Sequence, residues 1–250
     1  MDTSPGTAGA QSLRRALHLL RLLAEHHEDG IKLADVQEAS GLERSTVHRL
    51  LSCLVEERFA ERDGTGRAYR LGVDAMQLGF ASMRRVPLVD ACRPLMQKLA
   101  RMSGDTVFLV IRQGDYCLCL HREEGHFPVK VFTTDVGGRR LLGLGAGGLA
   151  LMAALADAEV ERIFERHGDE YAQAGFTRAR LLQAVRRTRG AGHADIVDTL
   201  TAGVSGVGCT FAASPGTLAA ISFGAITPRL PPQRKLELAR LLRAELPKTG

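Results

Sequence analysis

Several side chains that can donate hydrogen bonds to DNA bases lie close together near residue 45. In the segment Glu43-Arg44-Ser45-Thr46-Val47-His48-Arg49, apolar residues recur at helical spacing and continue to Leu54. With that face committed to a core, the opposite face offers Arg44, Thr46, His48 and Arg49, and Ser45 beside them is also predicted to contact DNA. An arginine can donate two hydrogen bonds to a guanine edge, and Ser45 is expected to cap the helix by accepting an amide of its first turn. The segment predicts a helix whose N-terminal end enters the major groove.

Three further arginines surround a glycine-rich turn that follows this helix. Arg62, Arg67 and Arg70 flank Asp63-Gly64-Thr65-Gly66, and the turn predicts a β-hairpin between Phe59–Arg62 and Arg67–Leu71. Such a hairpin can act as a wing against DNA phosphates. Residues 10–72 carry ten basic and ten acidic residues, so any attraction for DNA must be local. The alternative, short helices with a solvated polar face, is less favoured because a helix precedes the pair and a wing follows it.

A second motif, Gly143-Leu144-Gly145-Ala146-Gly147-Gly148, has the spacing of a dinucleotide-binding turn. That fingerprint needs a buried strand running into the first glycine and a parallel strand after the helix. Here Gly137-Gly138-Arg139-Arg140 interrupts the approach. We therefore favour glycines that let a helix pack on a sheet and line a pocket. A nucleotide-dependent enzyme remains the alternative.

Cys117, Cys119 and His121 alternate along one predicted strand and are expected to share a face. Side chains so spaced lie ~6.5–7 Å apart, too far to close around one metal ion. We expect buried core cysteines, no metal, no cofactor and, since no nucleophile elbow is present, no catalysis.

Hydrophobic periodicity predicts the helices and strands in the rest of the chain. It predicts a helix over 12–25, a helix-turn-helix over 33–58, a helix over 72–85 that Pro87 ends, and a helix over 89–102. Strands are expected over 106–112 and 116–122, joined by Gln113-Gly114-Asp115, and over 129–133, 203–211 and 217–226; further helices are expected from 146 to about 189 and over 231–246. The predicted organisation is a disordered tail over 1–9, a DNA-binding domain over 10–72, a linker helix over 73–86 and an α+β domain over 87–250.

Composition excludes several classes of protein. Hydrophobic residues make up 45% of the 250 residues and the net charge is +5, which fits a globular chain with an anionic partner. No apolar run reaches the ~18–20 residues of a membrane span, and the first residues lack a signal segment. Five cysteines at irregular positions fit reduced thiols. We expect a cytoplasmic protein that does not enter a membrane.

Several motifs of the chain match one known pattern: Ser12–Leu17, Gly41–Leu51, Tyr69-Arg70-Leu71-Gly72 and, in the second half, Val136–Gly143 and Gly192-His193-Ala194 followed by Gly203-Val204. Through them the chain resembles the IclR-type (isocitrate lyase regulator) bacterial transcription regulators. It implies a winged helix-turn-helix domain and a GAF-like effector-binding domain, joined by a helix that helps the protein to dimerise. Exposed apolar positions on the first helix and on Val73–Met83 also predict a dimer, and the resemblance extends this to a tetramer. The implied partners are double-stranded operator DNA and a small-molecule effector that shifts the protein between two states.

The resemblance also implies where the effector binds. Relatives that take small oxo-acids have an Asp, a Cys and two Ser in the pocket, and those positions fall here on Ile196, Gly206, Ser222 and Gly224. Only Ser222 has the same residue type as in those relatives. The turn Gly143-Leu144-Gly145 is expected to widen the pocket. Its walls are expected to include Leu118, Leu120 and Phe132. A mostly apolar pocket favours an aromatic or otherwise bulky acid with one carboxylate over a two- or three-carbon oxo-acid.

Overall fold

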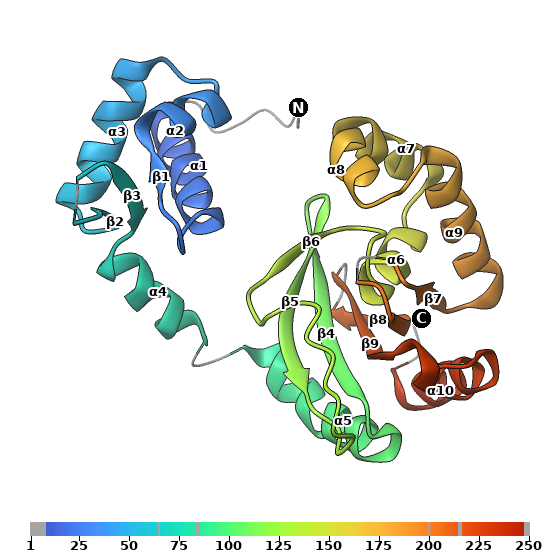
Figure 1. The fold of residues 1–250 in the computed structure, drawn as a ribbon. Coiled ribbons are helices and arrows are strands. Elements are labelled where there is room, and N and C mark those ends of the chain that lie inside the picture. Colours follow the sequence, from blue (N-terminus) through green and yellow to red (C-terminus); the bar gives the residue numbers. More distant parts are fainter. Residues whose placement is uncertain (1–8, 65, 84–85, 200, 215–216, 248–250) are drawn as a thin grey trace. The chain divides into compact units, whose positions relative to one another are not determined.

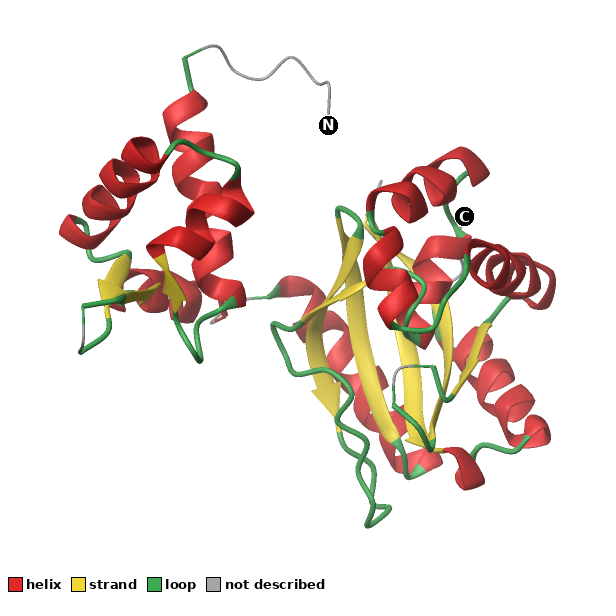
Figure 2. Cartoon of the chain, turned by 45° about the horizontal axis from the view of Figure 1, so that its top comes forward, coloured by secondary structure: helices red, strands yellow, loops and turns green. Residues whose placement is uncertain are grey.

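The chain folds into two compact units, Met1–Val86 and Pro87–Gly250, seen in a computed structural model (Figures 1 and 2). The structure describes residues 9–64, 66–83, 86–199, 201–214 and 217–247. All but the last residue of the expected tail over 1–9 lies outside the described residues. Each unit is taken by itself below.

The N-terminal unit is a helical domain with a small sheet. Its elements are α1 (Gln11–Glu25), β1 (Ile31–Lys32), α2 (Leu33–Ser40), α3 (Arg44–Glu56), β2 (Ala60–Arg62), β3 (Ala68–Leu71) and α4 (Val73–Met83). The sheet order is β1-β3-β2, so the two-residue strand β1, absent from the sequence prediction, pairs with the wing. The core joins α1, α2 and α3 through side chains with no exposed surface: Leu19, Leu23, Val36, Val47 and Leu51.

The turn between α2 and α3 depends on one glycine. Gly41 ends α2 with φ at +65°, a left-handed conformation that costs residues with a Cβ about 1–2 kcal/mol. The expected Ser45 cap is wrong. Glu43 is the last residue with an extended backbone, so α3 already begins at Arg44 and Ser45 lies within its first turn. A capping side chain must stand before the helix, where the backbone is not yet helical.

The C-terminal unit is a sheet with helices on both faces. Its strands are β4 (Thr106–Gln113), β5 (Tyr116–Glu123), β6 (Arg139–Leu141), β7 (Ala194–Val197), β8 (Val204–Ser214) and β9 (Thr217–Ile226). Its helices are α5 (Pro87–Ser103), α6 (Ala146–Ala153), α7 (Asp157–Arg166), α8 (Gly168–Gln173), α9 (Arg178–Ala191), the 3-10 turn η1 (Thr227–Arg229) and α10 (Pro232–Glu245). Pro87 thus begins α5 instead of only ending the helix before it, as proline does readily at a first helical position.

The six strands have the order β6-β5-β4-β9-β8-β7, and every pairing recorded among them is antiparallel. Helix α6 packs on the centre of one face, while α5 packs on β4 and β5, and α10 on β8 (Figure 2). Phe108 and Val110 point to the α6 side and join its core, whereas Leu109 between them does not. The expected strand over 129–133 is not formed. Strand β6 pairs with β5 instead, with Tyr116 opposite Leu141.

A bulge in β5 reverses part of the predicted pattern. Cys119 pairs with Val110 and His121 with Leu109, which leaves Leu120 as an extra residue. Paired residues share a face, and Val110 and Leu109 lie on opposite faces. His121 is therefore turned away from Cys117 and Cys119, and the three side chains do not share a face.

None of the helices in the described ranges combines the length and the apolar character that crossing a membrane requires.

Candidate DNA-binding surface and ligand cavity

Helix α3 presents its polar residues to the outside. Arg44, Ser45, His48 and Arg49 are exposed and Thr46 is half-buried, while Val47, Leu51 and Leu54 are buried in the core. Spacings of three and four residues place the exposed side chains on adjacent stripes of one face. Within the described part of the chain, no carboxylate forms an ion pair with Arg44 or Arg49, so both guanidinium groups can meet a negatively charged partner.

The hairpin that follows holds two of its three predicted arginines at the surface. The Asp63 carboxylate accepts hydrogen bonds from the amides of Arg67, at 2.8 Å, and Ala68, at 3.1 Å, which fixes the turn and leaves the Arg67 side chain exposed. The exposed Arg62 guanidinium lies 5.3 Å from the centre of the Tyr69 ring. Arg70 differs, because it packs toward Gly30 and its buried Nε has no recorded hydrogen-bond partner. Thr65 lies outside the described residues.

The C-terminal unit contains a cavity of about 60 Å³ between the start of α6 and the central strands. Six of the predicted effector residues line it: Leu144, Gly145, Ile196, Gly206, Ser222 and Gly224. They come from the turn before α6 and from β7, β8 and β9. The register explains their meeting, because Gly206 pairs with both Ile196 and Gly224.

Four predicted residues do not line the cavity. Leu118 lies between Cys117 and Cys119, and these two cysteines line the cavity in its place, while Leu120 is the bulged residue. Phe132 is 53% exposed and lies under the Arg122 guanidinium, 4.0 Å from its ring centre. Gly143 has φ at +88°, and a Cβ there would come within 2.6 Å of Leu181, so it faces the α9 core.

The cavity wall is mostly apolar but includes polar residues that the sequence did not single out. Besides Phe108, Val110 and Phe223, it contains Arg140, four threonines and two serines: Thr133, Thr134, Thr199, Thr201, Ser205 and Ser222. Periodicity could not have identified Arg140, because the edge strand β6 was not predicted.

Burial keeps the cavity thiols neutral. It raises the pKa of Cys117 and of Cys119 to about 11, so both are protonated at neutral pH. Burial also lowers the pKa of Arg140, although the nearby cysteines partly oppose this. An arginine remains protonated after such a shift, and the cavity therefore contains one positive charge.

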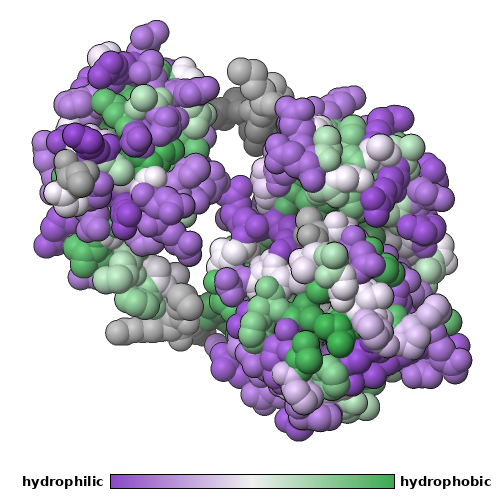
Figure 3. All heavy atoms as spheres, in the orientation of Figure 1, coloured by the Kyte–Doolittle hydropathy of each residue, from purple (hydrophilic) through white to green (hydrophobic). Residues whose placement is uncertain are grey.

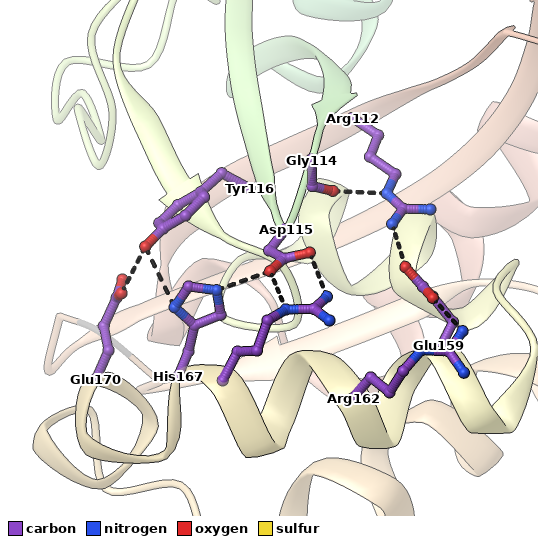
Figure 4. Close-up of polar contacts among 9 residues, drawn as sticks. Arg112, Gly114, Asp115, Tyr116, Glu159, Arg162, His167 and Glu170 are labelled. Carbon is purple, nitrogen blue, oxygen red and sulfur yellow. Dashed lines mark hydrogen bonds and ion pairs between the residues drawn. The ribbon is translucent and has the colours of Figure 1, made fainter. Parts of the chain in front are cut away.

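A polar cluster fixes the turn that leads into the cavity (Figure 4). The Asp115 carboxylate accepts two hydrogen bonds from Arg166 at 2.8 Å and lies 2.8 Å from His167 Nε2, and the bond to Arg166 is the main reason that its pKa is lowered. The Asp115 carbonyl accepts the amide of Leu142 at 3.0 Å, and the Tyr171 hydroxyl donates to the Leu142 carbonyl at 2.7 Å. Both the amide and the carbonyl of Leu142 are therefore hydrogen-bonded, just before the glycine turn.

The dinucleotide-binding alternative is contradicted by this topology. Strand β6, which runs into the glycine turn, pairs antiparallel with β5, and the next strand after α6 is β7, three helices later. A dinucleotide site requires parallel strands on either side of its helix. The motif Gly143–Gly148 instead brings α6 close to the sheet, where a Cβ on Gly147 would lie 2.7 Å from Val110.

A winged helix-turn-helix unit followed by a separate α/β unit with an internal cavity defines a class of two-domain regulators. Two family models match the chain: the IclR helix-turn-helix domain over residues 12–64, and the C-terminal domain of bacterial transcriptional regulators of the IclR type over residues 80–246. The chain belongs to the IclR family of bacterial transcriptional regulators, and the resemblance and the fold class predicted from the sequence are confirmed.

Individual relatives agree. The chain is 34% identical to the HTH-type transcriptional regulator BhcR of Paracoccus denitrificans over 63% of its own length and 55% of that protein, so it matches little more than half of this relative. It is 30% identical to the HTH-type transcriptional regulator Rv1719 of Mycobacterium tuberculosis over 88% of its length and 83% of that protein. An IclR-family regulator from Brucella abortus shares the fold with a TM-score of 0.78 at 22% identity, over 94% of this chain and 92% of the other.

Proposed function

We propose that the protein is a transcription regulator that binds double-stranded operator DNA through α3 and the wing, in the bacterial cytoplasm. The observation that carries this is the pair of exposed arginines, Arg44 and Arg49, on the first turns of a helix whose other face is fully packed. The N-terminal end of such a helix reads base edges, while Arg62 and Arg67 contact phosphates. The chain performs no catalysis in this proposal.

Fluorescence anisotropy with DNA from upstream of the gene tests the proposal. A specific regulator binds its site roughly 10³–10⁷ times more tightly than unrelated DNA. A shuffled fragment of the same composition is the control. Equal affinity for both fragments at physiological salt would contradict sequence-specific binding.

We further propose that the protein works as a homodimer or a homotetramer. On α1, Leu13 is 61% and Leu17 42% exposed, and on α4 the exposed apolar residues are Val73, Met76, Leu78 and Phe80. Figure 3 shows the apolar side chains of α4 on the surface of the N-terminal unit. Exposed apolar area of this kind marks contacts with another chain, and a dimer would place two copies of α3 in successive major grooves.

The cavity is the proposed effector site, and an organic acid is the proposed effector. The preference for a bulky aromatic acid rested on a mostly apolar pocket, and the lining is mostly apolar, with one positive charge from Arg140. That preference stays a prediction. The cavity of about 60 Å³ is smaller than the ~150 Å³ that takes up benzene, so a small acid fits without rearrangement, whereas a bulky acid needs the cavity to widen. A thermal-shift comparison of acetate, pyruvate and benzoate tests this, since a ligand at 100 times its Kd stabilises by ~2.7 kcal/mol.

A further inference from the structure

Arg140 is a cation inside the cavity with no acidic partner. It lies on the short edge strand β6, and its Nη2 donates to the backbone carbonyl of Thr133. No carboxylate among the described residues lies within ion-pair distance of it. An arginine has five N–H donors, so most of its hydrogen-bonding capacity is open to a ligand.

The Arg140 side chain reaches the start of α6. A Cβ on Gly145 would lie 3.6 Å from Arg140 Cδ and 3.8 Å from Nη1, which places the guanidinium group beside the residue that precedes the helix. Helix α6 has neither a capping side chain nor an acidic residue in its first turn. Its first amides therefore point their N–H groups and the positive end of the helix dipole into the same space.

Ser222 adds a third donor. The residue is only 5% exposed, it lines the cavity, and within the described residues its hydroxyl has no recorded hydrogen-bond partner. Its Oγ lies 3.3 Å from the position of a Cβ on Gly147, so it stands against the first turn of α6. The hydroxyl is therefore free to donate to a group that enters the cavity.

No carboxylate among the described residues balances the charge of Arg140. The nearest acidic groups in the wall are the thiols of Cys117 and Cys119, and both stay protonated at neutral pH. Burying a cation without a counter-charge is unfavourable, and an anionic ligand offsets that cost. The first turn of a helix is also a favourable place for such an anion.

We propose that Arg140 selects effectors with a single carboxylate, which it binds together with the Ser222 hydroxyl and the first amides of α6. This inference rests on the proposed role of the cavity as the effector site. The carboxylate accepts from the guanidinium group at one end, and the remainder of the ligand contacts Phe108, Val110 and Phe223. One cation balances one negative charge, so a neutral analogue binds weakly.

Calorimetry on the full-length protein tests this with acetate, pyruvate and benzoate, each beside its uncharged amide. The variant is Arg140→Leu, and the matched control is Arg139→Gln. Arg139 is the neighbouring residue, and strand alternation turns it away from the cavity, where its guanidinium lies 4.5 Å from the Tyr116 ring centre. We expect Arg140→Leu to weaken binding of the acid about 10- to 100-fold, the loss that follows from removing hydrogen bonds to a charged group, and Arg139→Gln to leave it unchanged.

The outcomes separate this inference from the function on which it rests. If acid binds Arg140→Leu as tightly as the wild type, the acid effector stands and the role of Arg140 is wrong. If the amide binds the wild type as tightly as the acid, selection by charge is wrong. If no acid binds the wild type, the acid effector itself is contradicted. Should Arg140→Leu fail to fold by circular dichroism, Arg140→Gln, which keeps a donor for the Thr133 carbonyl, takes its place.

Discussion

Carboxylate partners identify several arginines that hold the fold together. Arg58 pairs with Asp74 at 3.1 Å, and Arg229 and Arg234 both pair with the buried Asp105, at 2.6 and 2.7 Å. These pairs hold elements together. Arg44, Arg49 and Arg140 have no such partner among the described residues, and all three lie at proposed binding surfaces. A carboxylate partner therefore identifies an arginine that holds elements together, but its absence alone does not identify a binding arginine, since the exposed Arg21 on α1 also has no recorded carboxylate partner in the described part of the chain.

Substitution of Arg49 tests the assignment of the DNA-reading face. Arg49→Ala is expected to weaken binding to the operator by ~1–3 kcal/mol, because a bidentate contact to a base edge is lost. Arg67→Ala in the wing is expected to weaken all DNA sequences alike and to reduce the salt dependence by about one unit of slope. Anisotropy at several salt concentrations measures both effects, with Arg21→Ala on α1 as the control. Unchanged affinity of a folded Arg49→Ala protein would contradict the assigned face.

Asp115 gives a prediction about pH. Its pKa is lowered in the folded protein, chiefly by the hydrogen bonds from Arg166, so the carboxylate stabilises the fold above its unfolded pKa of ~3.9. That contribution is lost as the pH falls through the lower, folded pKa. Asp115→Asn should therefore cost about 1 kcal/mol at pH 7, since Arg166 is partly exposed, and much less near pH 3. Urea unfolding at both pH values measures the difference, and an equal loss at both would show that charge is not the cause.

At the scale of elements, the positions of turns and caps decide which side chains become available. The left-handed Gly41 sets the angle between α2 and α3, and the doubly held Leu142 fixes the approach to α6. Neither residue touches a proposed partner directly. Both determine where residues that do so are placed.

Gly41→Ala tests the turn between α2 and α3. A Cβ at this position meets nothing within 4 Å, so the expected loss of about 1 kcal/mol comes from the positive φ alone. Gly190→Ala in α9 is the matched control, because that position is also open but helical, and there alanine should stabilise by roughly 0.5–1 kcal/mol. Thermal unfolding of the two variants measures whether each substitution raises or lowers the stability of the protein. A stabilised Gly41→Ala protein would contradict the structure of the turn.

Local patterns allowed the helix-turn-helix and the long central strands to be predicted, since their periodicity lies within a few residues. Strands β1, β6 and β7 were not predicted, because each has only two to four residues and forms only by pairing with a strand elsewhere in the sequence. Six of the ten residues predicted to line the cavity do so, and the other four were mistaken for a similar reason. Leucine and cysteine are both readily buried, so the sequence of Cys117–Leu120 does not show which of these residues face the cavity. The bulge at Leu120 also has no recognisable pattern in the sequence around it.

At the scale of the whole molecule, exposed apolar residues on α1 and α4 predict self-association. Light scattering is expected to give at least twice the chain mass of 27.0 kDa at micromolar concentration. Replacing Leu78 and Phe80, each 60% exposed, by polar residues should shift the protein toward monomer without unfolding it, because neither belongs to the core. A mass of one chain at all micromolar concentrations for the unaltered protein would contradict the assembly.

We propose that acid binding in one unit and operator binding in the other are linked. Linkage requires that a saturating acid changes the Kd for operator DNA by the same factor by which saturating DNA changes the Kd for the acid, and couplings of this kind are about 5- to 150-fold. Titration of the operator with and without the acid, and of the acid with and without the operator, measures both factors on one preparation. We predict two equal factors that differ from one. An acid that binds in the cavity and leaves the Kd for operator DNA unchanged would contradict the account.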